Sequence, residues 1–396
     1  MLFSPEEQYT KHGYYNVGDF KTFSKYEAYL HANMQFDQIK FNFNEHVFDK
    51  CDWSTEPQED LYEMLKNRAI QLRSKYDYLV LMYSSGTDGR TILDTFVSNN
   101  IRLDEICSQH TTKYDKKEAC FNHEVFYGAV PIVQKLGIKH RLIDLSDYLL
   151  DYTNSEEFDN MEYFANSFLC RTHRMRTFNN EYSNHMVKEY DDILKKGKSV
   201  CFIWGIEKPS ISYNNESYEF RFVDVTVNRA LSSYITKAPF SHENFFWTPD
   251  YPEIAIKHAH MAVNAIQDLE PSSPLLCTLH ELPNGGPFIQ YDKIRYLDYK
   301  QAIKVLYPNL IYDFNMDPRF RFQRTHGRIF VLADKWLLES NHESTFKHTN
   351  KLKSMFNNLK NYNYFTYRQG KLFNIKVVDG KKYTIKGSNN TLSTKF

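Results

Sequence analysis

The chain has 396 residues, of which 42% are hydrophobic and 16% aromatic, so it can bury a large core, and its length favours two or three domains. Its 49 basic side chains balance 49 acidic ones, which excludes a global electrostatic attraction to nucleic acid or to a membrane surface. No apolar run reaches the about 18 residues that span a bilayer, and the six cysteines are scattered without a CxxC pair, so a cytoplasmic protein with reduced thiols and no membrane contact is expected.

Two patterns precede the first strongly apolar run of the sequence. Apolar side chains alternate at positions 39, 41 and 43, which predicts a strand within residues 36–43. Apolar residues recur near helical spacing in residues 57–75 and predict a helix. Residues 78–83, YLVLMY, are continuously apolar, as is typical of parallel strands that are buried on both faces. A further helix is predicted directly afterwards, over residues 88–98.

Strands and helices then alternate along the chain. Strands are predicted at 105–110, 140–145 and 200–205, and helices at 117–136 (bent near Pro131), 158–169 and 181–195. This alternation predicts right-handed βαβ units and a mostly parallel sheet, hence an α/β fold. Ligands of such sheets bind beyond the carboxyl ends of the strands.

The character of the sequence changes after about residue 215. A helix is predicted to begin near Asp250, and another over 291–308 that ends at Pro308. Alternating runs around Asp379–Gly380 predict a hairpin in a tail rich in lysine. The expected organisation is an N-terminal β-containing extension, an α/β domain, a mainly helical substrate or acceptor region, and a basic C-terminal extension with the hairpin; the corresponding ranges are 1–56, 57–215, 216–340 and 341–396.

The small polar loop SSGTDG lies where the strand at 78–83 gives way to the next helix. Backbone N–H groups at a helix start favour an anion there, and the helix dipole adds to this preference. The sequence contains neither GxxxxGK[ST] nor GxGxxG, so neither a Walker loop nor a dinucleotide fingerprint is present. The loop predicts a phosphate site. Gly86 and Gly89 would allow close approach of the backbone, and the hydroxyl donors would be Ser84, Ser85 and Thr87. Asp88 is suited to a bridging divalent cation.

The loop resembles the PP-loop of the ATP pyrophosphatases, SGGxDS, with Ser85 in place of the first glycine and Gly89 in place of the final serine. Its surroundings are similar to the synthetase domain of asparagine synthetase and β-lactam synthetase. The similar segments are the helix before the loop (61–77), EVFYGAVPIVQKLGIKHRLIDL (124–145) and VCFIWGIEKPSI (200–211). The resemblance covers roughly residues 60–215 and extends more weakly to about residue 340.

The resemblance implies a mostly parallel five-stranded sheet of the Rossmann-like HUP type, with helices on both faces and helical and small β additions. It also implies ATP and Mg²⁺ as ligands and a reaction that forms AMP and pyrophosphate. Asp88 and Glu207 would hold the metal, and Lys208 or Arg90 would neutralise phosphate oxygens during catalysis. The nucleotide would contact residues 84–89, Cys107, Ser108 and Gly205.

Two features depart from the family. Its acidic loop normally carries an Asp-Glu pair, whereas here Glu207 is followed by Lys208. The glutaminase half of asparagine synthetase needs an N-terminal cysteine, whereas this sequence starts with Met1, so the acceptor amine is expected from elsewhere.

Three functions remain open at this point. The first is an AMP-forming synthetase or amide-forming ligase that acts on a small-molecule carboxylate or amine acceptor. The second is a PP-loop enzyme that adenylates and aminates a nucleic-acid base, which the basic segments 170–178 and 317–328 and the basic tail favour. The third is a non-catalytic nucleotide-binding protein with a degenerate loop. The structural alternative to all three is an ordinary polar turn, with Cys107 buried as a small hydrophobe.

Overall fold

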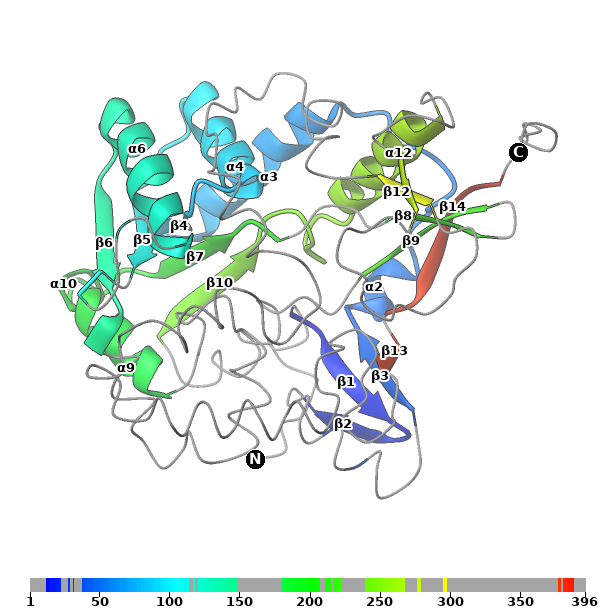
Figure 1. The fold of residues 1–396 in the computed structure, drawn as a ribbon, viewed down its shortest axis with the longest axis horizontal. Helices are drawn as coiled ribbons and strands as arrows, with labels where there is room; N and C mark the ends of the chain where they lie inside the picture. The colour runs from blue at the N-terminus through cyan, green and yellow to red at the C-terminus, as the bar shows by residue number, and fades with distance from the viewer. Residues whose placement is uncertain are drawn as a thin grey trace.

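Five parallel strands form the central sheet of the structure, a computed structural model (Figure 1). Their order across the sheet is β10-β7-β4-β5-β6, so the predicted α/β fold with a parallel five-stranded sheet is confirmed. The strands are β4 (Tyr78–Met82), β5 (Glu105–His110), β6 (His140–Asp144), β7 (Val200–Trp204) and β10 (Phe240–Asn244). The structure describes residues 12–22, 28, 31, 38–110, 112–113, 117, 120–147, 180–206, 211–214, 217–222, 239–267, 276–278, 295–297, 377–378 and 380–387.

The strand order places a switch in direction at the middle of the sheet. The chain starts at β4, moves outward through β5 to β6, and then returns to the other side of β4 for β7 and β10. The carboxyl ends of β4 and β7 therefore lie side by side with connections that leave in opposite directions. In open α/β sheets, ligands bind at such a point.

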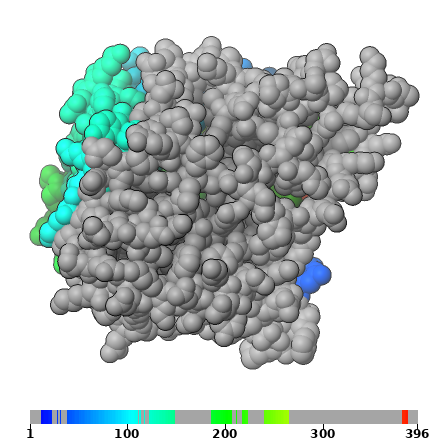
Figure 2. Space-filling model, in the orientation of Figure 1, coloured from blue at the N-terminus to red at the C-terminus, as the bar shows by residue number. Residues whose placement is uncertain are grey.

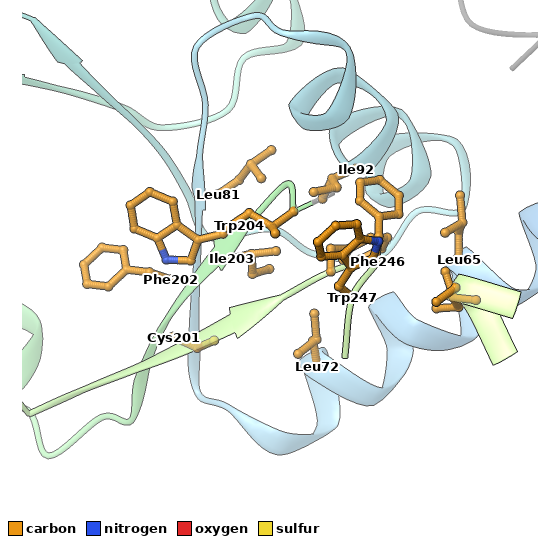
Figure 3. Packing of buried hydrophobic residues seen from close by; sticks show 14 of the residues in the cluster. Leu65, Leu72, Leu81, Ile92, Cys201, Phe202, Ile203, Trp204, Phe246 and Trp247 are labelled. Carbon is orange, nitrogen blue, oxygen red and sulfur yellow. The ribbon is translucent and has the colours of Figure 1, made fainter. Parts of the chain in front are cut away.

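Helices cover both faces of this sheet (Figure 1). Cys201 and Ile203 of β7 lie toward Leu72 and Ile92, whereas Phe202 points away from them (Figure 3). On that second face, the ring of Tyr190 packs edge-on against Phe202, with centroids 5.2 Å apart. One face carries α3 (Leu61–Lys75), α4 (Thr87–Ser98) and α6 (Val130–Leu136), and the other carries α9 (Asn180–Glu189) and α10 (Asp191–Leu194).

The helix that connects β5 to β6 is irregular, as expected from Pro131. It runs through α5 (Cys120–His123), a π-helical segment η2 (Glu124–Ala129) and α6. Proline lacks an N–H group and its ring crowds the carbonyl four residues earlier, so the wider π-helical turn accommodates it. Residues of the β6 and α6 edge reach the surface along one side of the molecule (Figure 2).

Smaller sheets lie beside the central sheet (Figure 1). One sheet has the order β13-β3-β1-β2, and another has the order β14-β9-β8. A cluster of buried rings joins them: Phe43, Phe48, Trp53, Phe220, Phe222, Trp247 and Tyr383. The elements are β1 (Tyr14–Val17), β2 (Phe20–Thr22), β3 (Ile39–Asn42), α2 (Glu45–Phe48), β8 (Ile211–Asn214), β9 (Ser217–Arg221), α12 (Glu253–Gln267), β13 (Val377–Val378) and β14 (Lys382–Gly387).

Two sequence predictions are wrong in this part of the chain. The runs around Asp379–Gly380 do not pair with each other, because β13 joins β3 and β14 joins β9. Residues within the helix predicted over 291–308 form strand β12 (Arg295–Leu297), which pairs with β11 (Leu276–Thr278). In both cases a distant strand supplies hydrogen bonds that local patterns do not reveal.

No helix in the described part of the chain combines the length and apolar character that crossing a bilayer requires. The helix predicted over 158–169 lies outside the described residues.

Candidate functional site

The loop SSGTDG lies at the carboxyl end of β4, at the switch point of the sheet. Tyr83 still bonds to β5 through its N–H and the Cys107 carbonyl, 2.9 Å apart. Gly86 then caps α4 in an extended conformation, and the first helical hydrogen bond runs from Arg90 N to Gly86 O at 2.9 Å. The preceding N–H groups, those of residues 86–89, have no acceptor within the helix. This is the strand–loop–helix arrangement that binds phosphates.

The end of β7 packs against the start of α4. A Cβ atom on Gly205 would lie 2.8 Å from the Cβ of Asp88 and 3.1 Å from the backbone N of Gly89. No side chain fits in that space, so glycine is required for this close approach. The loops after β4 and β7, both singled out from the sequence, therefore meet at one site.

The two glycines of the loop have different surroundings. A Cβ atom on Gly86 would meet only Ser84 Oγ, at 3.8 Å, so this side of the loop is open. A Cβ atom on Gly89 would lie 2.8 Å from the ring of Tyr83. The Tyr83 ring therefore leaves no room for a serine side chain at position 89 unless the ring moves, so this residue offers a ligand only its backbone N–H.

Ser85 has a different role from the one that the sequence predicted. Its backbone is left-handed, with φ of 61°, and its side chain is buried, with 2% exposure. Its hydroxyl donates to the carbonyl oxygen of Glu124 in η2, at 3.0 Å. The hydroxyl thus anchors the loop to the π-helical segment and is not directed at a phosphate. The serine that stands where the resembled pattern has its first glycine supplies this anchor.

Cys107 and Ser108 support the loop from within the sheet. The Ser108 hydroxyl donates to the Tyr83 carbonyl at 2.7 Å, and His140 Nε2 lies 2.9 Å from Ser108 Oγ. Because the serine proton is committed to Tyr83, His140 donates its Nε2–H to Ser108. Burial lowers the pKa of His140 to about 4 and raises that of Cys107 to about 12, so both side chains are neutral near pH 7. The side chains of Cys107 and Ser108 are both buried.

Of the predicted charged residues, Asp88 and Arg90 lie in the first two turns of α4. Arg90 Nε lies 2.9 Å from the Asp94 carboxylate, one turn further along the helix. Burial raises the pKa of the Asp94 carboxyl, while Arg90 acts in the opposite direction. Glu207 and Lys208 lie outside the described residues.

The described residues contain no group of three or more His, Cys, Asp or Glu side chains that could hold a metal ion by themselves. Magnesium in nucleotide sites takes one or two carboxylates, and substrate phosphates and water complete its shell. Asp88, the second residue of α4, could supply one carboxylate ligand to such a shared site.

No family model matches the chain, and no curated protein matches it. The assignment of this site therefore depends on the geometry above.

Three residues of the site were missed in the sequence. Glu124 contacts the loop only through the tertiary fold, and no local signal marks it. Tyr83 directly precedes the loop, but the sequence assigned it only to the buried strand. Asp94 had a signal, because it follows Arg90 by four residues on a predicted helix, the spacing at which opposite charges pair.

Proposed function

We propose that the protein is an ATP-dependent, AMP-forming synthetase or amide-forming ligase. The observation that carries the proposal is the meeting of two loops at the switch point, where Gly205 admits the backbone of Asp88 and Gly89 to close contact. That arrangement leaves the helix N–H groups and the open side of Gly86 for the phosphates of a nucleotide.

In the proposed reaction, a substrate carboxylate or carbonyl oxygen attacks the α-phosphorus of ATP. The bond from the α-phosphorus to the bridging oxygen breaks and pyrophosphate leaves; a nucleophile then displaces AMP. Magnesium, when bound, would offset the negative charge of the phosphates. Asp88, with Glu207, would hold the metal, while the N–H groups of residues 86–89 bind the phosphate oxygens and Arg90 or Lys208 neutralises the developing charge.

The acceptor is a small carboxylate or amine in this proposal. The alternative of a nucleic-acid substrate depends on basic segments that lie mainly outside the described residues. Within the described tail, Lys381 pairs with Asp49 at 2.9 Å and Lys382 with Glu219 at 2.6 Å, so these charges are already balanced. Among the described residues, Cys51, Cys107 and Cys201 form no disulfide, and the proposal includes a reducing, cytoplasmic location.

Incubation with α-labelled ATP and Mg²⁺, with small carboxylates and amines or with RNA or DNA, tests the proposal. Formation of AMP and pyrophosphate that depends on a small acceptor supports it, and formation only with nucleic acid supports the alternative. Formation of ADP and phosphate contradicts both. Binding of ATP without turnover under every condition is the result expected of a non-catalytic nucleotide-binding protein.

A matched pair of variants assigns the activity to the loop. Asp88→Asn is expected to abolish pyrophosphate release while the protein stays folded. Asp77→Asn is the control, because Asp77 precedes the same strand at its opposite end and accepts hydrogen bonds from Ser199 N and Oγ, at 3.0 and 2.7 Å. Undiminished turnover in Asp88→Asn removes this carboxylate from the mechanism.

A further inference from the structure

Arg90 is oriented by one neighbour. Its Nε lies 2.9 and 3.0 Å from the two carboxylate oxygens of Asp94. Among the described residues, no hydrogen bond or ion pair involves its Nη1 or Nη2 atoms, and its side chain is only 20% exposed. A guanidinium held through Nε keeps two parallel N–H donors for a planar or tetrahedral anion.

This arrangement carries two electrostatic costs in the protein without a ligand. Arg90 is the fourth residue of α4, where the positive end of the helix dipole disfavours a cation. Asp94 is partly buried, with 32% of its side chain exposed, and burial raises its pKa in spite of the adjacent guanidinium, so holding it as a carboxylate opposes folding. A polyanion bound at the helix start would attract the Arg90 cation and so offset the unfavourable dipole interaction. The partly buried Asp94 carboxylate would then serve to orient Arg90 toward that anion.

Resting on the proposed function, we propose that Asp94 is a positioning residue of the phosphate site. It holds Arg90 through Nε, so that Nη1 and Nη2 bind the pyrophosphate portion of the nucleotide. Asp94 itself does not contact the ligand. A synthetase that releases pyrophosphate also binds it as a product, so magnesium pyrophosphate alone is a sufficient probe.

The pair of Arg90 and Asp94 could instead oppose phosphate binding, and removal of Asp94 would then change the affinity in the opposite direction. If Asp94 instead held Arg90 away from the phosphates, removal of its charge would release the guanidinium and tighten binding. The direction of the change in affinity therefore distinguishes positioning from competition without any knowledge of the acceptor substrate.

The test is calorimetric titration of the full chain with magnesium pyrophosphate. Asp94→Asn is expected to weaken binding by about tenfold, while Asp94→Glu, which keeps a carboxylate at the same helical spacing, recovers most of the affinity. Thermal unfolding of ligand-free Asp94→Asn is expected at or above the native temperature, because the buried charge is gone. A residue with a merely structural role would lose stability and affinity together.

The control is Asp191→Asn, which removes the carboxylate from a more exposed ion pair of the same i,i+4 spacing, Lys195 with Asp191 at 2.5 Å, on the opposite face of the sheet. Its affinity for magnesium pyrophosphate is expected to equal that of the native chain. Unchanged or tighter binding by Asp94→Asn overturns the positioning role and leaves the proposed function standing. A native chain that binds neither ATP nor magnesium pyrophosphate overturns both.

Discussion

The contact between Ser85 and Glu124 allows a quantitative test of the loop geometry. Ser85 combines a left-handed backbone, φ 61°, with a buried hydrogen bond of 3.0 Å to the Glu124 carbonyl. In an L-residue this backbone costs about 1–2 kcal/mol, and glycine adopts it freely. Loss of a buried hydrogen bond that leaves its acceptor in place costs about 1–3 kcal/mol.

Two substitutions separate these terms. Ser85→Ala keeps the strained backbone and removes the anchor, so the free energy of unfolding is expected to fall by about 1–3 kcal/mol. Ser85→Gly also removes the anchor but relieves the strain, and glycine's extra freedom in the unfolded chain takes back roughly 0.5–1 kcal/mol. The lost anchor is common to both variants, so the glycine variant is expected to be more stable than the alanine variant by about 0–1.5 kcal/mol.

Urea unfolding followed by circular dichroism ranks the stabilities of the native protein and the two variants. The ranking is valid when the slope of the free energy of unfolding against urea concentration is the same for all three. A glycine variant that is less stable than the alanine variant would refute the strain argument. Native stability in Ser85→Ala would refute the anchor.

Three further changes test other parts of the structure. Gly205→Ala places a Cβ atom 2.8 Å from that of Asp88, so a loss of about 1–3 kcal/mol and weaker ATP binding are expected in urea unfolding and calorimetry. His140 has its pKa lowered from about 6.5 to about 4, so its stabilising effect is complete above pH 6.5 and is lost as the pH falls toward 4. His140→Gln cannot take up that proton, so its free energy of unfolding is expected to fall less steeply as the pH is lowered over this range. Tyr383→Ala removes a ring stacked 4.4 Å from Trp53 and is expected to cost about 3–5 kcal/mol, with loss of near-ultraviolet dichroism.

Each of these changes has a comparison that sharpens it. Tyr383→Phe removes only the hydroxyl bond to Asp49, of 3.0 Å, and should have a much smaller effect than alanine. If the free energy of unfolding changes with pH in the same way for the native protein and His140→Gln, the neutral state of that imidazole is contradicted. Native ATP binding by Gly205→Ala would show that the two loops do not need their close approach.

The central sheet was predictable because its signals are local. Continuous apolar runs mark β4 and β7, and both are buried along most or all of their length. The strand β5 occupies the predicted range, residues 105–110. The candidate site at the end of β4 was proposed from one more local feature, a run of small polar residues before a helix, and the structure places that run between β4 and α4.

The remaining features depend on partners far away in the sequence. Ser85 bonds to a residue 39 positions later, and β14 pairs with a strand more than 160 positions earlier. Periodicity around Asp379–Gly380 correctly marks extended chain, but it cannot identify which strand supplies the hydrogen bonds. The same limit explains why Ser85 was expected to face a phosphate.

The pairing of β13 and β14 with earlier parts of the chain has a consequence for synthesis. Phe48 and Trp53 share their aromatic cluster with Tyr383, and β14 ends at Gly387, 339 residues after Phe48 (387 minus 48). At about 5–20 residues per second, a ribosome needs roughly 17–70 s to cover that distance. Until β14 has been synthesised, the ring of Trp53 lacks its stacked neighbour Tyr383, and the aromatic cluster is incomplete. A chaperone that shields aromatic surface during translation should therefore raise the yield of this protein more than that of one whose strands pair in the order of their synthesis.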